Sequence, residues 1–233
     1  MNLPPDAPQR RIRSFVRREG RITDAQRAAM EQLWPVYGLD APAAAFDLDA
    51  VFGRKAPVVF EIGFGNGDHL LSRAAGEPER DFIGVEVHRP GCGRVMMQAD
   101  RNGSKNLRVV CHDAVEVLRD WLQPAVLSEV VIYFPDPWHK KRHNKRRLVQ
   151  PEFLSLVVRA LRPGGILRMA TDWAPYAEQM LEALRATPAL RNLAADGGYA
   201  ERAATRPKTR FEARGERLGH EVFDLLAERI ADA

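Results

Sequence analysis

One stretch decides the fold: Val58-Val59-Phe60-Glu61-Ile62-Gly63-Phe64-Gly65-Asn66-Gly67-Asp68. Its first five residues form a short, mostly apolar run that is typical of a buried strand. The three glycines that follow allow the backbone to turn sharply and to approach a ligand closely. A helix is predicted over residues 68–75. A strand, a glycine-rich turn and a helix in this order indicate the ligand-binding edge of an α/β sheet.

The rest of the chain alternates strand and helix patterns in the same way. We predict strands over residues 82–87, 107–111, 130–134 and 166–170, a late strand around residues 222–226, and helices over residues 90–101, 114–122, 151–161 and 176–186. This alternation predicts a mostly parallel sheet with helices on both faces. Upstream, Thr23 is predicted to cap a helix over residues 24–33 that Pro35 stops, and a short helix is expected over residues 41–46 or 48–52.

Length and composition fit a single α/β domain with an extension. The chain has 233 residues, of which 45% are hydrophobic and 28% charged. It contains no uncharged apolar run of about 18 residues, which a membrane span needs. The first 20 residues have no apolar h-region, so we do not expect a secretory signal there. Two isolated cysteines indicate a reducing compartment. We expect a cytoplasmic protein with a basic tail of low order over residues 1–22, a helical extension over 23–56 and the α/β domain over 57–233.

Positive charge gathers at two places on this chain, although the net charge is only +4. Six arginines lie within the first 21 residues, and six of the nine residues 139–147 are Lys or Arg. We call residues 140–147 the basic strip. Two separated basic segments suggest a polyanionic partner that is contacted twice. For the tail, a disordered solubilising arm is an almost equal alternative.

The residues around the glycines indicate which cofactor binds. Asp68 occupies the position where a dinucleotide-binding turn has Gly or Ala, and no G-x-x-x-x-G-K-[ST] phosphate loop is present. An acid ahead of the glycines, Glu61, suits a ligand that carries an ammonium and a sulfonium, which describes S-adenosylmethionine. The next two strands also end in acids: Glu86 is placed for ribose hydroxyls and Asp113 for a purine amino group. A tight turn without a ligand is the alternative, but it leaves these acids unexplained.

A second motif follows the strand over residues 130–134. Pro135-Asp136-Pro137-Trp138 places one carboxylate between two prolines, which restrict the backbone on either side and make the turn stiff. An aromatic ring and the basic strip come next. A fixed acid, a stacking surface and a row of cations suit a nucleobase and its phosphate backbone. Taken singly, the motifs could be an ordinary turn and a solvated surface.

Together these motifs resemble the bacterial tRNA (guanine-N7)-methyltransferase family. The resemblance spans about residues 58–226 and also includes Gly84-Val85-Glu86-Val87-His88, Ala170-Thr171-Asp172-Trp173, Thr209-Arg210-Phe211-Glu212, Arg214-Gly215 and Leu218-Gly219-His220. It implies a class I S-adenosylmethionine-dependent methyltransferase fold, Rossmann-like, whose seven-stranded sheet is mostly parallel with an antiparallel last strand. It also implies methyl transfer to N7 of a guanine in the tRNA variable loop. The expected partner is tRNA, without a membrane or a metal, and the expected state is a monomer or a homodimer.

The resemblance also assigns roles by position. It implies cofactor contacts at Glu61, Gly63, Gly65, Gly67, Glu86, Asp113 and Asp136. Asp136 matches the catalytic position as well. It implies substrate contacts at Lys140, Asp172, Thr209, Arg210, Phe211 and Glu212. It implies RNA contacts at Arg142, His143, Asn144, Lys145, Arg146 and Arg147.

The chemistry of guanine N7 explains why an acid would lie there. N7 has a lone pair and no proton to lose, so positive charge rises on the purine in the transition state and a fixed carboxylate, Asp136, stabilises it. Asp172 offers a second acceptor for the base, and an N-cap for the helix that follows is an alternative role that can coexist with it. Glu212 closes the base pocket or forms a surface ion pair.

Three other functions compete with this interpretation. An amino-methyltransferase acting on adenine or cytosine has a related proline turn after the same strand, but the basic strip argues for folded RNA. A non-catalytic RNA-binding module on the same fold would be favoured by loss of the cofactor acids, and none is lost. A nicotinamide-dependent oxidoreductase is disfavoured by Asp68.

Overall fold

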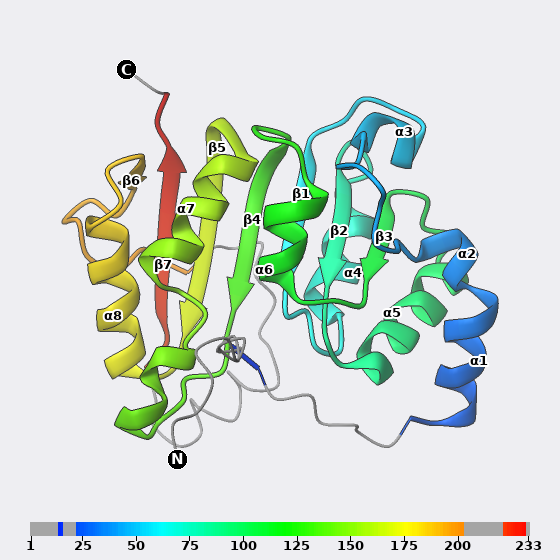
Figure 1. Cartoon of the computed structure of the whole chain (residues 1–233), viewed down its shortest axis with the longest axis horizontal. Coiled ribbons are helices and arrows are strands. Elements are labelled where there is room, and N and C mark those ends of the chain that lie inside the picture. The colour runs from blue at the N-terminus through cyan, green and yellow to red at the C-terminus, as the bar shows by residue number, and fades with distance from the viewer. Residues whose placement is uncertain (1–13, 16–21, 203–220, 232–233) are drawn as a thin grey trace, which may run out of the picture.

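The strands build one twisted sheet whose order is β3-β2-β1-β4-β5-β7-β6 (Figure 1). The computed structural model describes residues 14–15, 22–202 and 221–231. The strands are β1 (Val58–Ile62), β2 (Asp81–Val85), β3 (Leu107–Val110), β4 (Leu127–Tyr133), β5 (Leu161–Thr171), β6 (Leu190–Asn192) and β7 (Phe223–Arg229). The first five are parallel, and β7 runs antiparallel to both β5 and β6. The mostly parallel sheet with an antiparallel late strand is confirmed.

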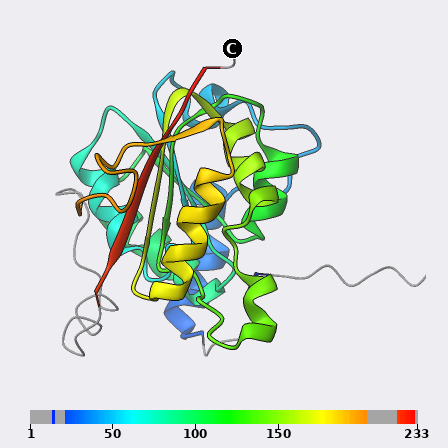
Figure 2. The same ribbon diagram turned by 90° about the vertical axis from the view of Figure 1, so that its left-hand side faces the viewer.

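Two helical layers cover the sheet (Figures 1 and 2). On one face lie α6 (Ala114–Glu116), the π-helix η1 (Val117–Trp121), α7 (Pro151–Ala160) and α8 (Ala174–Arg185). On the other lie α4 (Asp68–Gly76) and α5 (Arg89–Arg101). Because side chains alternate along a strand, Phe60 and Ile62 join the first layer's core and Val59 joins the second. Both faces of β1 are therefore buried, as its apolar run predicts.

The upstream segment divides between the two layers: α1 (Asp24–Gln32) and α2 (Trp34–Tyr37) pack with the second layer, and α3 (Leu48–Phe52) packs with the first. Thr23 caps α1 as expected, in a reciprocal capping box with Gln26, whose side chain also donates to the Pro90 carbonyl at the start of α5 (3.1 Å). The expectation that Pro35 stops this helix is only partly right, because α1 has already ended and Pro35 opens α2, where its missing N–H costs nothing. The boundary at residue 57 stays a prediction, and most of the expected tail lies outside the described residues.

Three elements differ from the sequence predictions. β5 begins at Leu161, so the Arg162–Gly165 turn is absorbed into the strand through an irregular register with β4. The helix expected over residues 114–122 splits into α6 and a π-helix. The short strand β6 was not predicted, because three residues carry no measurable alternation.

The chain order of the strands fixes where a ligand can bind. From β1 the chain proceeds to β2 and β3 on one side, and β4 and β5 lie on the other side. The order therefore reverses between β1 and β4, and open α/β sheets bind ligands outside the carboxyl ends of the strands at such a point. These ends face the lower edge in Figure 1. Within the described part of the chain, no helix has the length and apolarity needed to cross a bilayer.

Candidate active site

A pocket of about 300 Å³ opens at the carboxyl ends of β1, β2, β3 and β4. Its lining mixes apolar side chains from the strand ends, such as Ile62, Val85 and Ile132, with polar groups from the loops beyond them. Three carboxylates that the sequence singles out, Glu86, Asp113 and Asp136, line the pocket together, and Gly63 does too. The parallel topology thus brings together acids that are 50 residues apart in the chain (Glu86 to Asp136).

The glycine loop between β1 and α4 needs glycine for its backbone shape. Gly63, Gly65 and Gly67 have φ values of 70°, 56° and 77°, a region that residues with a Cβ rarely adopt. A Cβ at Gly67 would also lie 2.0 Å from Val95 Cγ2 on α5. At Gly63 and Gly65 nothing stands within 4 Å of such an atom, so the loop backbone faces open space there. The loop therefore exposes its backbone at Gly63, which lines the pocket, whereas Gly65 and Gly67 lie outside the lining.

Glu86 organises the second side of the pocket. One carboxylate oxygen accepts the N–H groups of Val87 (2.6 Å) and His88 (3.0 Å), and the other accepts the N–H of Gly65 (3.0 Å). The side chain therefore joins the glycine loop to the loop after β2. Three N–H donors hold the carboxylate in one orientation while its remaining lone pairs are available to a ligand.

Asp113 lies at the far wall of the pocket, after β3. Its Oδ1 accepts the N–H of Val115 (3.0 Å) and caps α6. The neighbouring His112 also lines the pocket; its ring stacks on Trp121 at a centroid distance of 4.8 Å, and its Nε2 contacts Glu116 at 2.7 Å. This wall of the pocket therefore consists of the His112 ring, stacked on Trp121, and the Asp113 carboxylate, which caps α6.

Glu61 is placed differently from the other acids. Its side chain is buried beneath the glycine loop, outside the pocket lining, and Oε2 lies 2.7 Å from Nδ1 of His69 on α4. The His69 ring packs edge-on against Tyr133 at the end of β4. A cofactor contact by Glu61 stays a prediction; the contact that the structure describes is with α4.

The turn that carries Asp136 is strained. Phe134 and Trp138, on either side of Pro135-Asp136-Pro137, have φ values of 51° and 48°. For residues with side chains this left-handed region costs about 1–2 kcal/mol each. The Phe134 N–H donates to the Ala170 carbonyl of β5 (2.8 Å). Asp136 itself is exposed at the pocket mouth, and its carboxylate has no hydrogen-bond partner among the described residues.

The Trp138 ring is in contact with other groups of the protein. Its Nε1 donates to the Ser14 carbonyl (3.0 Å), the Arg146 guanidinium lies 5.0 Å from the ring centroid, and His143 meets the ring edge. Ser14 and Phe15 also line the pocket. A segment far upstream in the sequence therefore lies across the pocket, next to the Asp136 turn.

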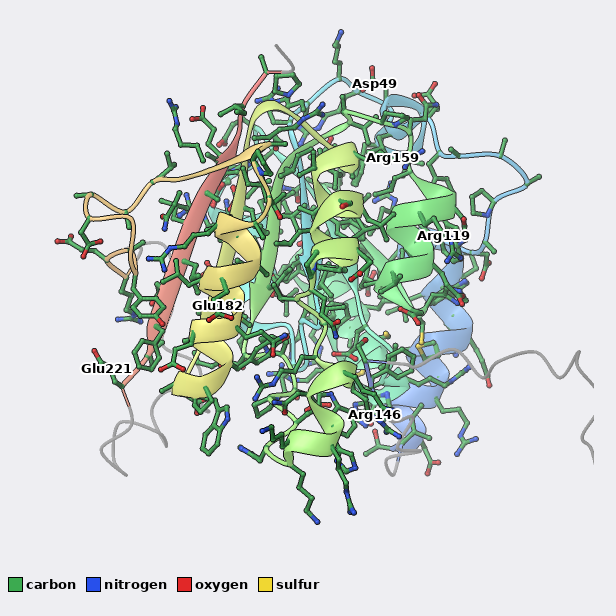
Figure 3. All side chains as sticks on the ribbon, turned by 60° about the vertical axis from the view of Figure 1, so that its left-hand side comes forward. Asp49, Arg119, Arg146, Arg159, Glu182 and Glu221 are labelled. Atoms are coloured by element: carbon green, nitrogen blue, oxygen red, sulfur yellow. The ribbon has the colours of Figure 1, made fainter. Side chains whose placement is uncertain are left out.

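The basic strip projects from the same end of the molecule. Residues Lys141–Arg146 form a 3₁₀-helix, η2, and the Lys and Arg side chains at 140, 141, 142 and 145 are exposed. Figure 3 shows Arg146 at the lower end of the molecule, opposite Asp49 and Arg159. Partial desolvation and then the charges of Arg142, Arg146, Lys140 and Lys145 lower the pKa of the His143 imidazole. The strip is a concentrated positive surface beside the pocket.

Arg147 is the exception in the strip. Its side chain is buried, with 4% exposed. Nε donates to the Pro137 carbonyl (2.8 Å), and Nη1 donates to the Pro175 carbonyl (3.1 Å) and to Oε1 of Gln179 (2.7 Å). Burial lowers the pKa of this guanidinium, which lies 4.9 Å from the Tyr176 ring centroid. Arg147 was expected to contact RNA, but its guanidinium already donates hydrogen bonds within the protein. The RNA contact stays a prediction.

The remaining expected substrate residues divide into two groups. Asp172 follows β5, and its neighbour Trp173 packs against His139 of the preceding loop at 4.3 Å, which brings the two segments together. The N-cap of α8 is Trp173, without a side-chain hydrogen bond, so Asp172 does not cap that helix. Thr209, Arg210, Phe211 and Glu212 lie outside the described residues. No group of potential metal ligands occurs in the described part of the chain.

Comparison with known proteins identifies the family. A family model described as "Putative methyltransferase" matches residues 55–225. The tRNA (guanine-N(7)-)-methyltransferase of Xanthomonas campestris pv. campestris strain 8004 is 58% identical over 221 residues, which is 95% of this chain and 85% of that protein. The chain belongs to the tRNA (guanine-N7)-methyltransferase family. Family members from Stutzerimonas stutzeri (55% identical; 96% of this chain, 94% of that protein) and Yersinia pseudotuberculosis (53%; 94% and 92%) agree.

Solved structures support the fold. The 16S rRNA methyltransferase KamB superposes with a TM-score of 0.57 at 18% identity, covering 92% of this chain and 97% of its own. The 16S rRNA (adenine(1408)-N(1))-methyltransferase from Catenulisporales acidiphilia gives 0.54 at 17% identity, covering 83% and 98%. The predicted class I methyltransferase fold is confirmed.

Sequence reasoning missed three residues at this site. Ser14 and Phe15 lie within the arginine-rich tail, whose composition hides any contact with the pocket. His69 gave no signal as a partner of Glu61, because the two are eight residues apart across a turn. For Arg147 a signal did exist: the apolar pair Leu148-Val149 follows it directly, and Val149 is fully buried.

Proposed function

We propose that this chain transfers a methyl group from S-adenosylmethionine to N7 of a guanine in the variable loop of tRNA. One observation carries the proposal: Asp136, a carboxylate without a partner in the described structure, lies at the mouth of a pocket lined by Glu86 and Asp113, directly beside the basic strip. An available acid between a nucleoside-sized pocket and a cationic surface is the arrangement that a base-modifying enzyme requires. The family membership supports the same reaction.

The residues present fit the cofactor. A pocket of about 300 Å³ with an apolar floor and few convergent polar groups suits a small molecule. Glu86 would hold the ribose hydroxyls, Asp113 would accept from the adenine amino group, and the exposed backbone of the glycine loop would allow the close approach that the methionine part needs. When bound, S-adenosylmethionine supplies a methyl group activated by its sulfonium.

The chain's own contribution is positioning and charge. Asp136 would accept hydrogen bonds from guanine N1–H or N2–H₂ and so orient N7, and its negative charge would stabilise the positive charge that develops on the purine. No general base is needed, because N7 carries no proton. Lys140 and Asp172 would contact the nucleotide, and the exposed cations of the strip would hold the tRNA phosphates.

The test is methylation of unmodified tRNA with labelled S-adenosylmethionine, followed by nucleoside analysis. We expect 7-methylguanosine, and we expect Asp136→Asn to lower kcat by about 10²-fold because the lost charge acts mainly in the transition state. Asp49→Asn is the control that should leave kcat unchanged, because Asp49 lies at the opposite end of the molecule from Arg146 of the basic strip (Figure 3).

Each competing outcome has its own signature. Label on the amino group of adenine or cytosine would indicate an amino-methyltransferase. Absence of label despite tRNA binding would indicate a non-catalytic RNA-binding module. A normal single-turnover rate for Asp136→Asn would remove Asp136 from the mechanism while leaving the reaction in place.

A further inference from the structure

The contacts of Arg147 connect the two segments that carry Asp136 and Asp172, the acids that are expected to face the base. Its Nε donates to the Pro137 carbonyl, one residue after Asp136. Its Nη1 donates to the Pro175 carbonyl in the first turn of α8, three residues after Asp172. A single planar guanidinium thus joins the turn after β4 to the helix after β5, at the carboxyl ends of two neighbouring strands.

The surroundings of Arg147 hold its guanidinium in place. Gln179, one turn further along α8, accepts from Nη1 at 2.7 Å and donates through Nε2 to the Val149 carbonyl at 3.2 Å. The ring of Tyr176 lies beneath the guanidinium, and its hydroxyl accepts the Val149 N–H at 3.0 Å. With 4% of the side chain exposed, the charge of Arg147 lies inside the protein, whereas Arg142 in the same strip is exposed.

The Asp136 turn needs such support. Both of its flanks, Phe134 and Trp138, have positive φ, and strained backbone persists only where the surrounding structure determines it from several sides. The Phe134 N–H is held by β5 on the upstream side. On the downstream side, the Pro137 carbonyl is held by Arg147. Proline offers no N–H, so this carbonyl is the only hydrogen-bonding group with which the Pro137 backbone can be anchored.

We infer that Arg147 is a positioning residue, which fixes the Asp136 turn against α8 and so sets where the Asp136 carboxylate stands, and that it does not bind RNA phosphate. The inference rests on the proposed methyl transfer. An acid that acts through its position loses effect when its turn shifts, and misplacement by about 1 Å can cost 10²-fold in rate. Arg147 therefore acts on kcat through Asp136, while the exposed cations act on tRNA affinity.

The charge-preserving variant separates the two roles. Lysine is adequate for a phosphate contact but cannot reproduce a planar fork that reaches three acceptors. We expect Arg147→Lys and Arg147→Met both to lower kcat by about 10- to 100-fold, with KM for tRNA and the salt dependence of tRNA binding within about twofold of wild type. Arg142→Met should do the reverse: it should raise KM and flatten the log–log salt slope by roughly 0.7–0.9, with kcat retained. Arg185→Lys, on the exposed face of α8, is the neutral control.

The results that would overturn the inference are distinct. A wild-type kcat for Arg147→Lys, combined with a raised KM and a flatter slope for Arg147→Met, would return Arg147 to the RNA-binding strip. Calorimetry with S-adenosylhomocysteine checks that each variant keeps a folded pocket. If the Arg147 variants do not fold, Gln179→Met decides, because it removes one acceptor of the guanidinium without changing charge: a severalfold lower kcat supports positioning, and a wild-type kcat refutes it. A wild-type enzyme that makes no 7-methylguanosine would overturn the proposed function itself, and the inference with it.

Discussion

Replacing Glu86 by glutamine tests the cofactor side of the pocket with the smallest change of shape. In the structure, one oxygen of Glu86 accepts from Val87 and His88, and the other accepts from Gly65. Glutamine keeps one acceptor oxygen but presents an NH₂ group on the other side. Either the Gly65 N–H or the pair after β2 then faces a donor instead of an acceptor, and in the first case the glycine loop loses its hydrogen bond to the side chain at position 86.

The expected magnitude follows from these hydrogen bonds. Hydrogen bonds to a charged group contribute about 1.5–3 kcal/mol each and neutral ones about 0.5–1.5 kcal/mol. If the Glu86 carboxylate accepts hydrogen bonds from two ribose hydroxyls, each bond would contribute about 1–1.5 kcal/mol less once the carboxylate is replaced by an amide. The sum, about 2–3 kcal/mol, corresponds to a roughly 30- to 150-fold higher Kd for the cofactor.

Isothermal titration calorimetry with S-adenosylhomocysteine measures this directly, because no methyl transfer takes place. Asp68→Asn is the matched control: it makes the same acid-to-amide change at the end of the same loop, in a carboxylate that lies outside the pocket lining and forms an exposed ion pair with Arg94. We expect its Kd to stay within about twofold of wild type. A Kd within about threefold of wild type for a folded Glu86→Gln would refute the assignment of Glu86 to the ribose.

Two further predictions concern tRNA binding and stability. The exposed cations of the strip are tested by changing Lys140, Lys141, Arg142 and Lys145 to Ser. This variant should raise KM for tRNA and flatten the log–log dependence of tRNA affinity on salt by roughly 0.7–0.9 for each phosphate that is no longer bound, with cofactor Kd unchanged. A salt dependence equal to that of wild type would exclude the strip from RNA binding. On β4, Glu129→Gln should destabilise the protein by about 1.5–3 kcal/mol at pH 7 in urea denaturation, because it removes the charged acceptor shared by the buried Arg73 and the partly buried Arg80 and Arg168, while Arg73 and Arg80 keep Glu77. Burial opposes the charged form of Glu129, but the hydrogen bond and charge of Arg73 and the charges of Arg80 and Arg168 outweigh it and hold its pKa below the ordinary value. The stabilisation is therefore complete above about pH 4.5 and is lost as pH falls through the lowered pKa, so the gap between wild type and variant should narrow in acid; a constant gap would contradict the linkage.

Much of the fold could be predicted because local pattern and topology agree. The predicted strand over residues 58–62 matches β1, and the capped helix after Thr23 matches α1 within one residue. The convergence of Glu86, Asp113 and Asp136 was also predictable, because parallel strands place their carboxyl ends on one edge of the sheet. What failed was local and short: β6 has three residues, and the π-helix η1 continues a helical pattern that periodicity cannot distinguish from an α-helix.

The roles of individual charged residues were harder to predict, because burial decides them and composition does not show burial. Glu61 belongs to the same set of acids as Glu86, yet it lies beneath the loop against His69. Arg147 belongs to the same basic run as Arg142, yet the chain enters the core at Val149 and takes its guanidinium inside. In both cases the residue lies one or two positions from a boundary between an exposed and a buried segment. A shift of one position there changes whether the side chain is exposed or buried.

This difference between charged residues of the same type bears on the role proposed for Asp136, whose carboxylate would have to be both fixed in place and available to a base. A carboxylate held by its own hydrogen bonds, like Glu86, has a defined orientation but part of its charge is already satisfied by protein donors. Asp136 accepts no hydrogen bond from the described residues, so its full charge is available to a base. Its orientation must then come from the backbone: two prolines restrict the turn, β5 holds the Phe134 N–H, and Arg147 holds the Pro137 carbonyl. The strain at Phe134 and Trp138 is the consequence of holding an acid through its main chain, and the buried guanidinium of Arg147 is what allows that strained turn to persist.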